Sequence, residues 1–396
     1  MDFYKRALEL NNETIEHRHF FHKNAEVGLY MPVAKAYIIE KLREYGLNPV
    51  PCGNGVAAIL GTSGPTILLR ADMDALPMEE ESGEPFACPT GTEAHTCGHD
   101  FHAAMLLTAA KMLKEQAERL KGTIKFMFQP AEETLEGCHH MIEHGILDAP
   151  APNAALAVHV TTGQIPVGTY MYNDRDAMMF SADTFRIRIH GKGAHGAYPH
   201  VSIDPITIGV HLHLVLQELI ARESNPLHSC ALTIGHFESG TTANIIPDTA
   251  ILEGSVRTNN LEARDKLVRR LKEVVPRTAE LYGGHAEIEM LSEVPPLICN
   301  PELTKKIVSY MNELSIPNLT GQPNITASAA EDFALIAERI PSTYLYFSAG
   351  YTDERGSYPA HNPKVRFNED VCPIGAACLA HCAMRWLEEF DISLSK

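Results

Sequence analysis

Apolar segments of strand length alternate with segments of helical periodicity along most of this chain, and this alternation limits the folds that it can adopt. Strands separated by helices are typical of an α/β layer with a largely parallel sheet. We therefore expect an α/β fold whose loops lie at strand ends, where polar ligands can converge. In the first 160 residues the predicted strands are Val56–Leu60, Thr66–Arg70, Thr123–Gln129 and Ala154–His159, and the predicted helices are Ala34–Tyr45 and Phe101–Gln116.

The middle of the chain has a different order of elements. Its periodicity predicts β-α-β-β-α-β within roughly 110 residues, which is the order of the split ferredoxin-like unit. The predicted segments are Thr184–His190, Ser202–Arg222, Ser229–Gly235, Thr249–Arg257, Leu261–Tyr282 and His285–Leu291. The α/β pattern returns from about Cys299. The simplest architecture is a discontinuous larger domain, residues 1–176 and 293–396, with a small α+β domain inserted at residues 177–292.

Composition excludes several classes of protein. The chain has 33 Lys and Arg against 50 Asp and Glu, a formal charge of −17, which argues against a nucleic-acid binder because such proteins need a basic face. The nine Cys are scattered, so we expect free thiols in a reducing cytoplasm rather than a disulfide framework. No signal-peptide core and no apolar run of about 18 residues is found, so no membrane span is expected.

Metal-capable side chains gather at predicted strand ends. Asp72 and Asp74 follow one strand, and in an extended segment residues two apart point the same way. Cys97 and His99 are also two apart, and a thiolate with an imidazole suits Zn²⁺. Taken separately, each pair also fits a structural explanation, namely a solvated strand end or a buried inert cysteine beside helix-capping residues.

A second group of such side chains follows the next two predicted strands. Glu132 and Glu133 come directly after the strand Thr123–Gln129, and adjacent carboxylates there diverge. One can therefore bind a metal while the other serves as general base for a water. When the pair is taken alone, an acidic helix N-terminus is the better explanation. His159 closes an apolar strand, where a histidine is more often part of the core.

Together these strand ends present Cys, His, Glu and His, which simple structural roles explain poorly. Other chemistries fit worse, because the G-x-S-x-G nucleophile elbow and the phosphate-binding P-loop are absent. The chain resembles the M20 metallopeptidase and amidohydrolase family, in the branch of hippurate hydrolase, aminoacylase-like enzymes and plant auxin-conjugate hydrolases. The motifs that carry the resemblance are, in order, RADMDALP (70–77), CGHDFH (97–102), FQPAEE (128–133), HV (159–160), GKGAHGAYPH (191–200), NIIP (244–247) and AEDFA (330–334).

The resemblance implies a zinc-exopeptidase-like catalytic domain with two divalent metal ions and an inserted lid that often mediates dimerisation. By motif, the implied metal ligands are Cys97, which bridges, with His99, Glu133, His159 and His361, the last in a P-x-H-x-P context. Glu132 resembles the catalytic acid/base and Asp74 a carboxylate that orients a ligand. In the lid, His195 resembles the residue that stabilises the oxyanion, in its own site or in the partner subunit's, while Asn244 and Arg257 are candidates for holding the substrate carboxylate. The surrounding His95, His102, His139, His140 and His200 match no ligand position, so we expect surface or packing roles.

The implied reaction is hydrolysis of an N-acyl amino acid to a carboxylate and a free amino acid. The metal is expected to be Zn²⁺, with Mn²⁺, Co²⁺ or Ni²⁺ as alternatives. Three other functions stay open at this point: a dipeptidase or carboxypeptidase with the same metals, a noncatalytic metal-binding protein, and a thiol hydrolase that uses Cys97 and His99. We expect a soluble homodimer or larger homo-oligomer, formed through the lid.

Overall fold

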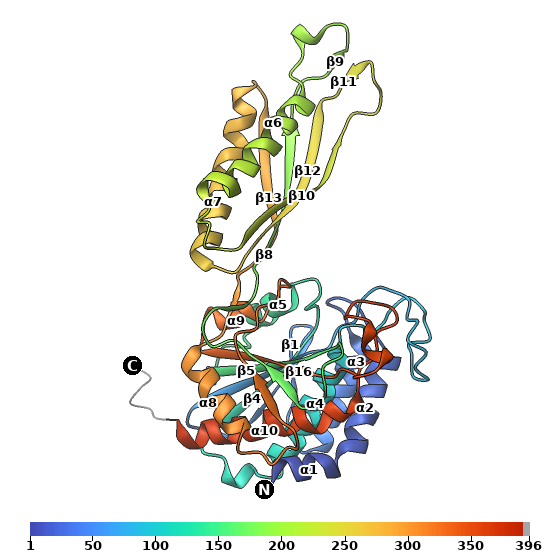
Figure 1. Ribbon diagram of the computed structural model, residues 1–396, viewed down its shortest axis with the longest axis vertical. Helices are drawn as coiled ribbons and strands as arrows, with labels where there is room; N and C mark the ends of the chain where they lie inside the picture. Colours follow the sequence, from blue (N-terminus) through green and yellow to red (C-terminus); the bar gives the residue numbers. More distant parts are fainter. Residues whose placement is uncertain (391–396) are drawn as a thin grey trace. The chain divides into compact units, whose positions relative to one another are not determined.

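The computed structural model describes residues 1–390, which divide into two compact units. The first unit comprises Met1–Met178, Ile298–Thr326 and the described chain from Leu335 onward, and the second comprises Met179–Leu297 and Ala327–Ala334. Figure 1 shows the path of the chain through both. The sequence did not indicate that the short segment 327–334 belongs with the second unit. As boundaries of functional domains, residues 176/177 and 292/293 stay a prediction.

An eight-stranded mixed sheet forms the centre of the first unit, in the order β1-β2-β4-β3-β5-β16-β6-β15. The four central strands β4, β3, β5 and β16 are parallel, so the predicted α/β class is confirmed. Outside these strands the pairing is mixed, since β1–β2, β2–β4 and β16–β6 are antiparallel and β6–β15 is parallel. The strands β1 and β2 must be antiparallel because a two-residue loop joins them, and such a loop cannot connect parallel strands. The strands are β1 Val50–Cys52, β2 Gly55–Leu60, β3 Thr66–Asp72, β4 Thr123–Gln129, β5 Ala154–Thr161, β6 Thr169–Met171, β15 Thr320–Gln322 and β16 Ser342–Ser348.

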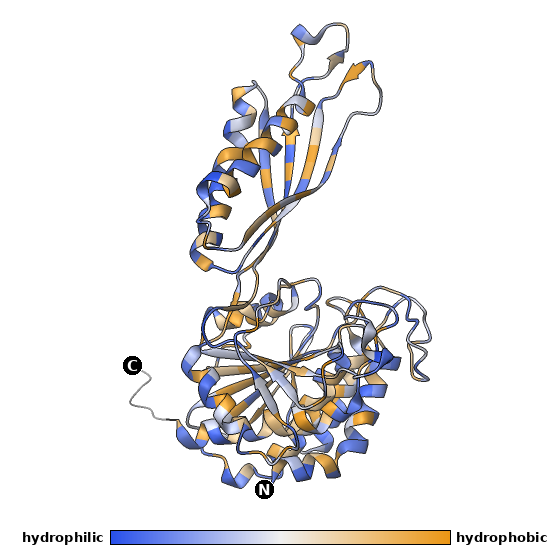
Figure 2. Ribbon diagram, in the orientation of Figure 1, coloured by the Kyte–Doolittle hydropathy of each residue, from blue (hydrophilic) through white to orange (hydrophobic). Residues whose placement is uncertain are grey.

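Helices enclose this sheet. The most buried is α4 (His99–Lys114), in which 14 of the 16 residues are buried, because it is apolar on nearly all sides and packs against α10 and α2. Figure 2 shows the apolar residues along these elements. The first turn of α4 is consequently held rigidly inside the unit. The other helices are α1 Phe3–Glu9, α2 Asn11–Lys23, α3 Pro32–Glu44, α5 Gly137–Glu143, α8 Pro301–Met311, α9 Ala334–Ala337 and α10 Cys372–Glu389.

The second unit contains the predicted β-α-β-β-α-β order. Its four-stranded antiparallel sheet has the order β10-β12-β8-β13, and α6 and α7 lie on one face of it (Figure 1). Alternate residues of β8 are buried against these helices in a separate apolar core. The elements are β8 Ala182–His190, α6 Pro205–Glu218, β10 Cys230–Ser239, β12 Thr249–Thr258, α7 Leu261–Leu281 and β13 His285–Val294, with the small ribbon β9 Ala194–His195 and β11 Ile245–Ile246 and the pair β7 Ala177–Met179 and β14 Leu297–Ile298.

Among residues 1–390, no helix combines the length and the apolar character that a membrane crossing requires.

Buried charges join α2 to the start of α4. Asp100 Oδ2 accepts hydrogen bonds from Arg18 Nε at 3.0 Å and from His22 Nδ1 at 2.8 Å, and Glu80 Oε2 lies 3.0 Å from His22 Nε2. Burial lowers the pKa of His22, but the hydrogen bonds to Asp100 and Glu80 outweigh it and raise that pKa to about 9. His22 is therefore a buried cation held between two carboxylates.

This cation predicts a loss of stability at alkaline pH. The stabilisation is fully present below the unfolded-state pKa of about 6.5 and is lost as pH rises through about 9, with a total of order 3 kcal/mol. We expect His22→Gln to be less stable than the parent at pH 6 and to lose less further stability up to pH 9.5. Urea unfolding at both values measures this, with the exposed His285→Gln as control. An identical pH dependence in the parent and His22→Gln would contradict the assignment.

Candidate metal centre

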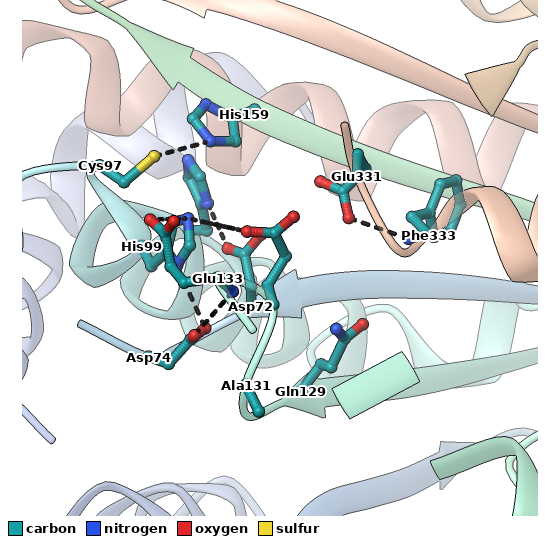
Figure 3. A network of polar contacts seen from close by, with 12 residues as sticks. Asp72, Asp74, Cys97, His99, Gln129, Ala131, Glu133, His159, Glu331 and Phe333 are labelled. Atoms are coloured by element: carbon teal, nitrogen blue, oxygen red, sulfur yellow. Dashed lines mark hydrogen bonds and ion pairs between the residues drawn. The ribbon is translucent and has the colours of Figure 1, made fainter. Parts of the chain in front are cut away.

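A tight turn at Gly98 brings Cys97 and His99 to the carboxyl ends of the central strands. Gly98 has a φ of +90°, and a Cβ atom there would lie 2.4 Å from Cγ2 of Val160 in β5. Only glycine tolerates both the conformation and the contact. The turn places Cys97 Sγ 3.5 Å from Nε2 of His159, the residue before Val160 (Figure 3).

Two loops with strained backbone bring the other candidate ligands to the same place. Ala131, between β4 and Glu132, has a φ of +54°, and His361 has a φ of +65°. The His361 Nε2 atom lies 3.3 Å from Cys97 Sγ and 3.3 Å from Glu133 Oε1. Non-glycine residues in this conformation are concentrated at functional sites, where the surroundings hold them in place.

Asp74 orients two of these residues at once. Its Oδ1 accepts a hydrogen bond from His99 Nδ1 at 3.2 Å, and its Oδ2 accepts one from the backbone N–H of Glu133 at 3.0 Å (Figure 3). The opposite ring nitrogen of His99, Nε2, then faces the carboxylates and lies 3.9 Å from both Glu132 Oε2 and Glu133 Oε1. A carboxylate behind a histidine in this way is the usual support of a metal ligand.

The side chains in this cluster fit a pair of cations. The buried atom His99 Nε2 has no hydrogen-bond partner among the described residues. Burial lowers the pKa of His159 well below its usual value, so the ring is in the neutral form that binds metal. Thiolate, imidazole and carboxylate are the ligands that Zn²⁺ prefers. Atoms within 4.8 Å of one another form the overlapping groups Cys97, His99 and His159; Cys97, Glu133 and His361; and His99, Glu132 and Glu133.

The shifted pKa values of Cys97 and His99 also fit a site that binds a cation. Burial raises the pKa of its thiol to about 12, despite the favourable effect of His99. Asp72, Cys97 and Asp74 together raise the pKa of His99 well above its usual value, although burial lowers it. The groups around His99 therefore favour a positive charge at this site.

Comparison with known proteins decides the family. Residues 68–385 match the family described as peptidase family M20/M25/M40. The chain belongs to this family. The resemblance drawn from the seven motifs is confirmed.

Relatives of this M20 chain include amide hydrolases from distant organisms. An N-acetyl-L-cysteine deacetylase of Bacillus subtilis is 37% identical over 389 residues, which are 97% of this chain and 90% of that protein. IAA-amino acid hydrolase ILR1-like 2 of Arabidopsis thaliana is 33% identical over 399 residues, covering 98% and 88%. The crystal structure of a dinuclear metal-binding M20 peptidase of Bacillus subtilis superposes with a TM-score of 0.80, at 28% identity and coverage of 96% and 99%.

The second unit of this M20 chain holds the remaining predicted residues. His195 is exposed on the ribbon β9–β11, and its Nδ1 accepts a hydrogen bond from the N–H of Ala197 at 3.0 Å. Asn244 lies next to it, since its carbonyl accepts from the N–H of Gly196 at 2.8 Å. Arg257 does not join them, because it lies eight residues along β12 from Thr249, about 26 Å of extended strand.

Sequence reasoning missed a buried pair beneath the candidate metal ligands of this M20 chain. His102 and Asp72 are fully buried, and the His102 Nδ1 atom makes a short hydrogen bond to Asp72 Oδ1. His102 Nε2 accepts the backbone N–H of Val160 at 2.8 Å, so the ring also supports the strand end that carries His159. His102 is buried, as a packing role implies, and it also makes hydrogen bonds that support the site. Its spacing of three from His99 on one helix was the available signal.

Because both oxygens of Asp74 accept hydrogen bonds, replacing its carboxylate with an amide should weaken metal binding. In Asp74→Asn, one of the two donors, His99 or Glu133, faces an N–H group instead of an oxygen. We expect metal affinity to fall about 10- to 100-fold, as for other carboxylates that support a metal-binding histidine. Equilibrium dialysis against zinc measures this, with Asp204→Asn as control because Asp204 also accepts a backbone N–H, at the start of α6. Unchanged affinity in Asp74→Asn would exclude the orienting role.

Proposed function

We propose that this protein is a metal-dependent amidohydrolase that cleaves the amide bond of N-acyl amino acids, giving a carboxylate and a free amino acid. The observation that carries the proposal is the convergence of five ligand-type side chains with a further carboxylate, that of Glu132, beside them. A metal-storage site needs the ligands only. A hydrolytic site needs a base as well. The deacetylase and amino acid hydrolase relatives support this chemistry.

The candidate ligands would hold two divalent ions. Cys97, His99 and His159 would hold one, and Cys97, Glu133 and His361 the other, because the ligand atoms within each group lie within 4.8 Å of one another. Thiolate and imidazole favour Zn²⁺, with Mn²⁺, Co²⁺ or Ni²⁺ as alternatives. Such ions supply Lewis-acid polarisation of the amide carbonyl and a lowered pKa for the attacking water.

The chain's own residues then move the protons. Glu132, nearly buried and 3.9 Å from His99 Nε2, takes a proton from the attacking water as the carbon–oxygen bond forms. It passes this proton to the leaving nitrogen as the carbon–nitrogen bond breaks, so that a carboxylate and a free amine result. His195 donates a hydrogen bond to the carbonyl oxygen as negative charge develops, a contribution typically worth about 2.7–4 kcal/mol.

The second unit has the proposed role of lid and dimerisation domain. Residues 177–292 would form this domain and residues 1–176 and 293–396 the catalytic domain. His195 acts in its own site or in the site of a partner subunit, and Asn244 and Arg257 are proposed to hold the substrate carboxylate. Since Arg257 lies apart from the other two along β12, it is the weaker candidate. Nine free cysteines support a cytoplasmic location.

Replacing Glu132 tests the proposal directly. Glu132→Gln keeps the size of the side chain and removes the base, so we expect an unchanged metal content and a kcat lower by about 10²- to 10⁴-fold. Hydrolysis of N-acetyl and N-benzoyl amino acids, with metal analysis of the same preparation, measures both. The exposed Glu118→Gln is the control. Normal turnover in Glu132→Gln would exclude its role as base.

A peptidase is the second candidate, because the dinuclear relative from Bacillus subtilis is described as one. The same substrate panel, extended to dipeptides, separates the two functions. Faster cleavage of dipeptides than of N-acyl amino acids would favour the peptidase. Activity that survives complete removal of metal by a chelator would instead support a thiol hydrolase, and absence of all hydrolysis with metal bound would support a metal-binding protein.

A further inference from the structure

A closed loop of 19 residues, Leu76–Ala94, connects the segment of Asp74 to that of Cys97; we name it the strap. Its two ends are paired, since Leu76 and Ala94 each donate a backbone hydrogen bond to the other's carbonyl at 3.0 Å. The metal centre does not use any side chain of the strap. Its contacts nevertheless reach two separate parts of the first unit.

One side of the strap is fixed to helix α2. The strap residue Glu80 pairs with the buried His22 at 3.0 Å. Phe86 stacks on the ring of His19 with 3.8 Å between centroids, and the guanidinium of Arg18 lies 4.7 Å from the centre of the Phe86 ring. Because α2 is itself held by buried charges at Asp100, this side of the strap is a rigid anchor.

The other side of the strap is fixed to the segment that carries His361. The backbone N–H of Glu81 donates to the carbonyl of Pro363 at 2.7 Å. The Glu84 Oε1 atom accepts a hydrogen bond from Arg366 Nε at 2.6 Å. The Glu84 side chain is 14% exposed and that of Arg366 is 34% exposed, so this ion pair is shielded from solvent more than a surface pair.

His361 requires such support more than the other candidate ligands do. Its side chain is 53% exposed, whereas the side chain of Glu133 is 12% exposed and that of His99 is fully buried. Its φ of +65° is unfavourable for histidine, and such a conformation persists only when the surroundings fix it. Its own backbone contributes one fixed point, the hydrogen bond from its N–H to the carbonyl of Thr96 at 2.9 Å.

We propose that Glu84 and Arg366 are positioning residues, whose ion pair clamps the His361 segment to the strap and so sets the affinity of the metal ion that His361 binds. The inference rests on the proposed function, in which His361 is a ligand. The pair touches neither metal nor substrate and acts through the backbone between residues 361 and 366. Its effect is therefore confined to one of the two ions.

Zinc binding to the metal-free full-length chain tests the proposal. Equilibrium dialysis at buffered free Zn²⁺ is compared for Glu84→Gln, Arg366→Gln, the exchanged pair Glu84→Arg with Arg366→Glu, and His361→Ala. The control is Glu313→Gln, because Glu313 also forms an ion pair with an arginine, Arg385, at 2.8 Å and away from the candidate ligands; its side chain is 40% exposed, against 14% for Glu84. We expect each single clamp variant to weaken one of two Zn²⁺ ions about tenfold, while the control binds as the parent does.

The exchanged pair tests whether the ion pair itself is required, and His361→Ala tests whether His361 is a ligand. Restored zinc affinity in the exchanged pair would show that the ion pair itself is required. A lowered unfolding temperature in the clamp variants, with both ions bound as in the parent, would overturn the proposal in favour of a purely structural role. If His361→Ala loses an ion but the clamp variants do not, only the positioning role fails. If His361→Ala binds both ions normally, the ligand assignment fails as well.

Discussion

The candidate metal centre depends on the close approach of Gly98 to Val160. A Cβ atom at position 98 would collide with the β5 side chain, so the path of the chain between Cys97 and His99 exists only with glycine there. This approach puts the thiol, the first turn of α4 and the end of β5 within one small volume. The remaining ligands then come from loops that follow the neighbouring parallel strands, whose carboxyl ends lie at the same edge of the sheet.

The surrounding structure stabilises the unfavourable backbone conformations and buried charges of this arrangement. Ala131 and His361 adopt left-handed backbone conformations, and Asp72, Asp74 and Asp100 are buried carboxylates. Each carboxylate is paired: Asp72 with Arg70 and His102, Asp74 with His99, and Asp100 with Arg18 and His22. Unpaired, they would destabilise the fold strongly. The helices α2 and α4 thus do more than cover the sheet, because they provide the groups that allow charge to be buried beside the ligands.

Strong local patterns in the sequence made much of the fold and of the candidate site predictable. The apolar strands such as Thr123–Gln129 and the β-α-β-β-α-β order of the second unit follow from periodicity, and the ligand candidates follow from motif spacing. The antiparallel pairs of the large sheet, β1–β2, β2–β4 and β16–β6, were not predictable in this way, because periodicity does not give strand direction. The contacts of His102 and of the strap also join residues far apart in the chain. Glu84 and Arg366 are separated by 282 residues, and no local pattern reports such a pair.

We propose that Cys97 Sγ would be shared by two cations. Anomalous diffraction at the zinc edge from zinc-loaded crystals tests it most directly. We expect two peaks on either side of Cys97 Sγ, each about 2.3 Å from the sulfur, with imidazole nitrogens at about 2.0–2.1 Å. One peak should have His99 and His159 as neighbours and the other Glu133 and His361. A single peak, or peaks more distant from Cys97 Sγ than a metal–sulfur bond, would contradict the shared-sulfur arrangement.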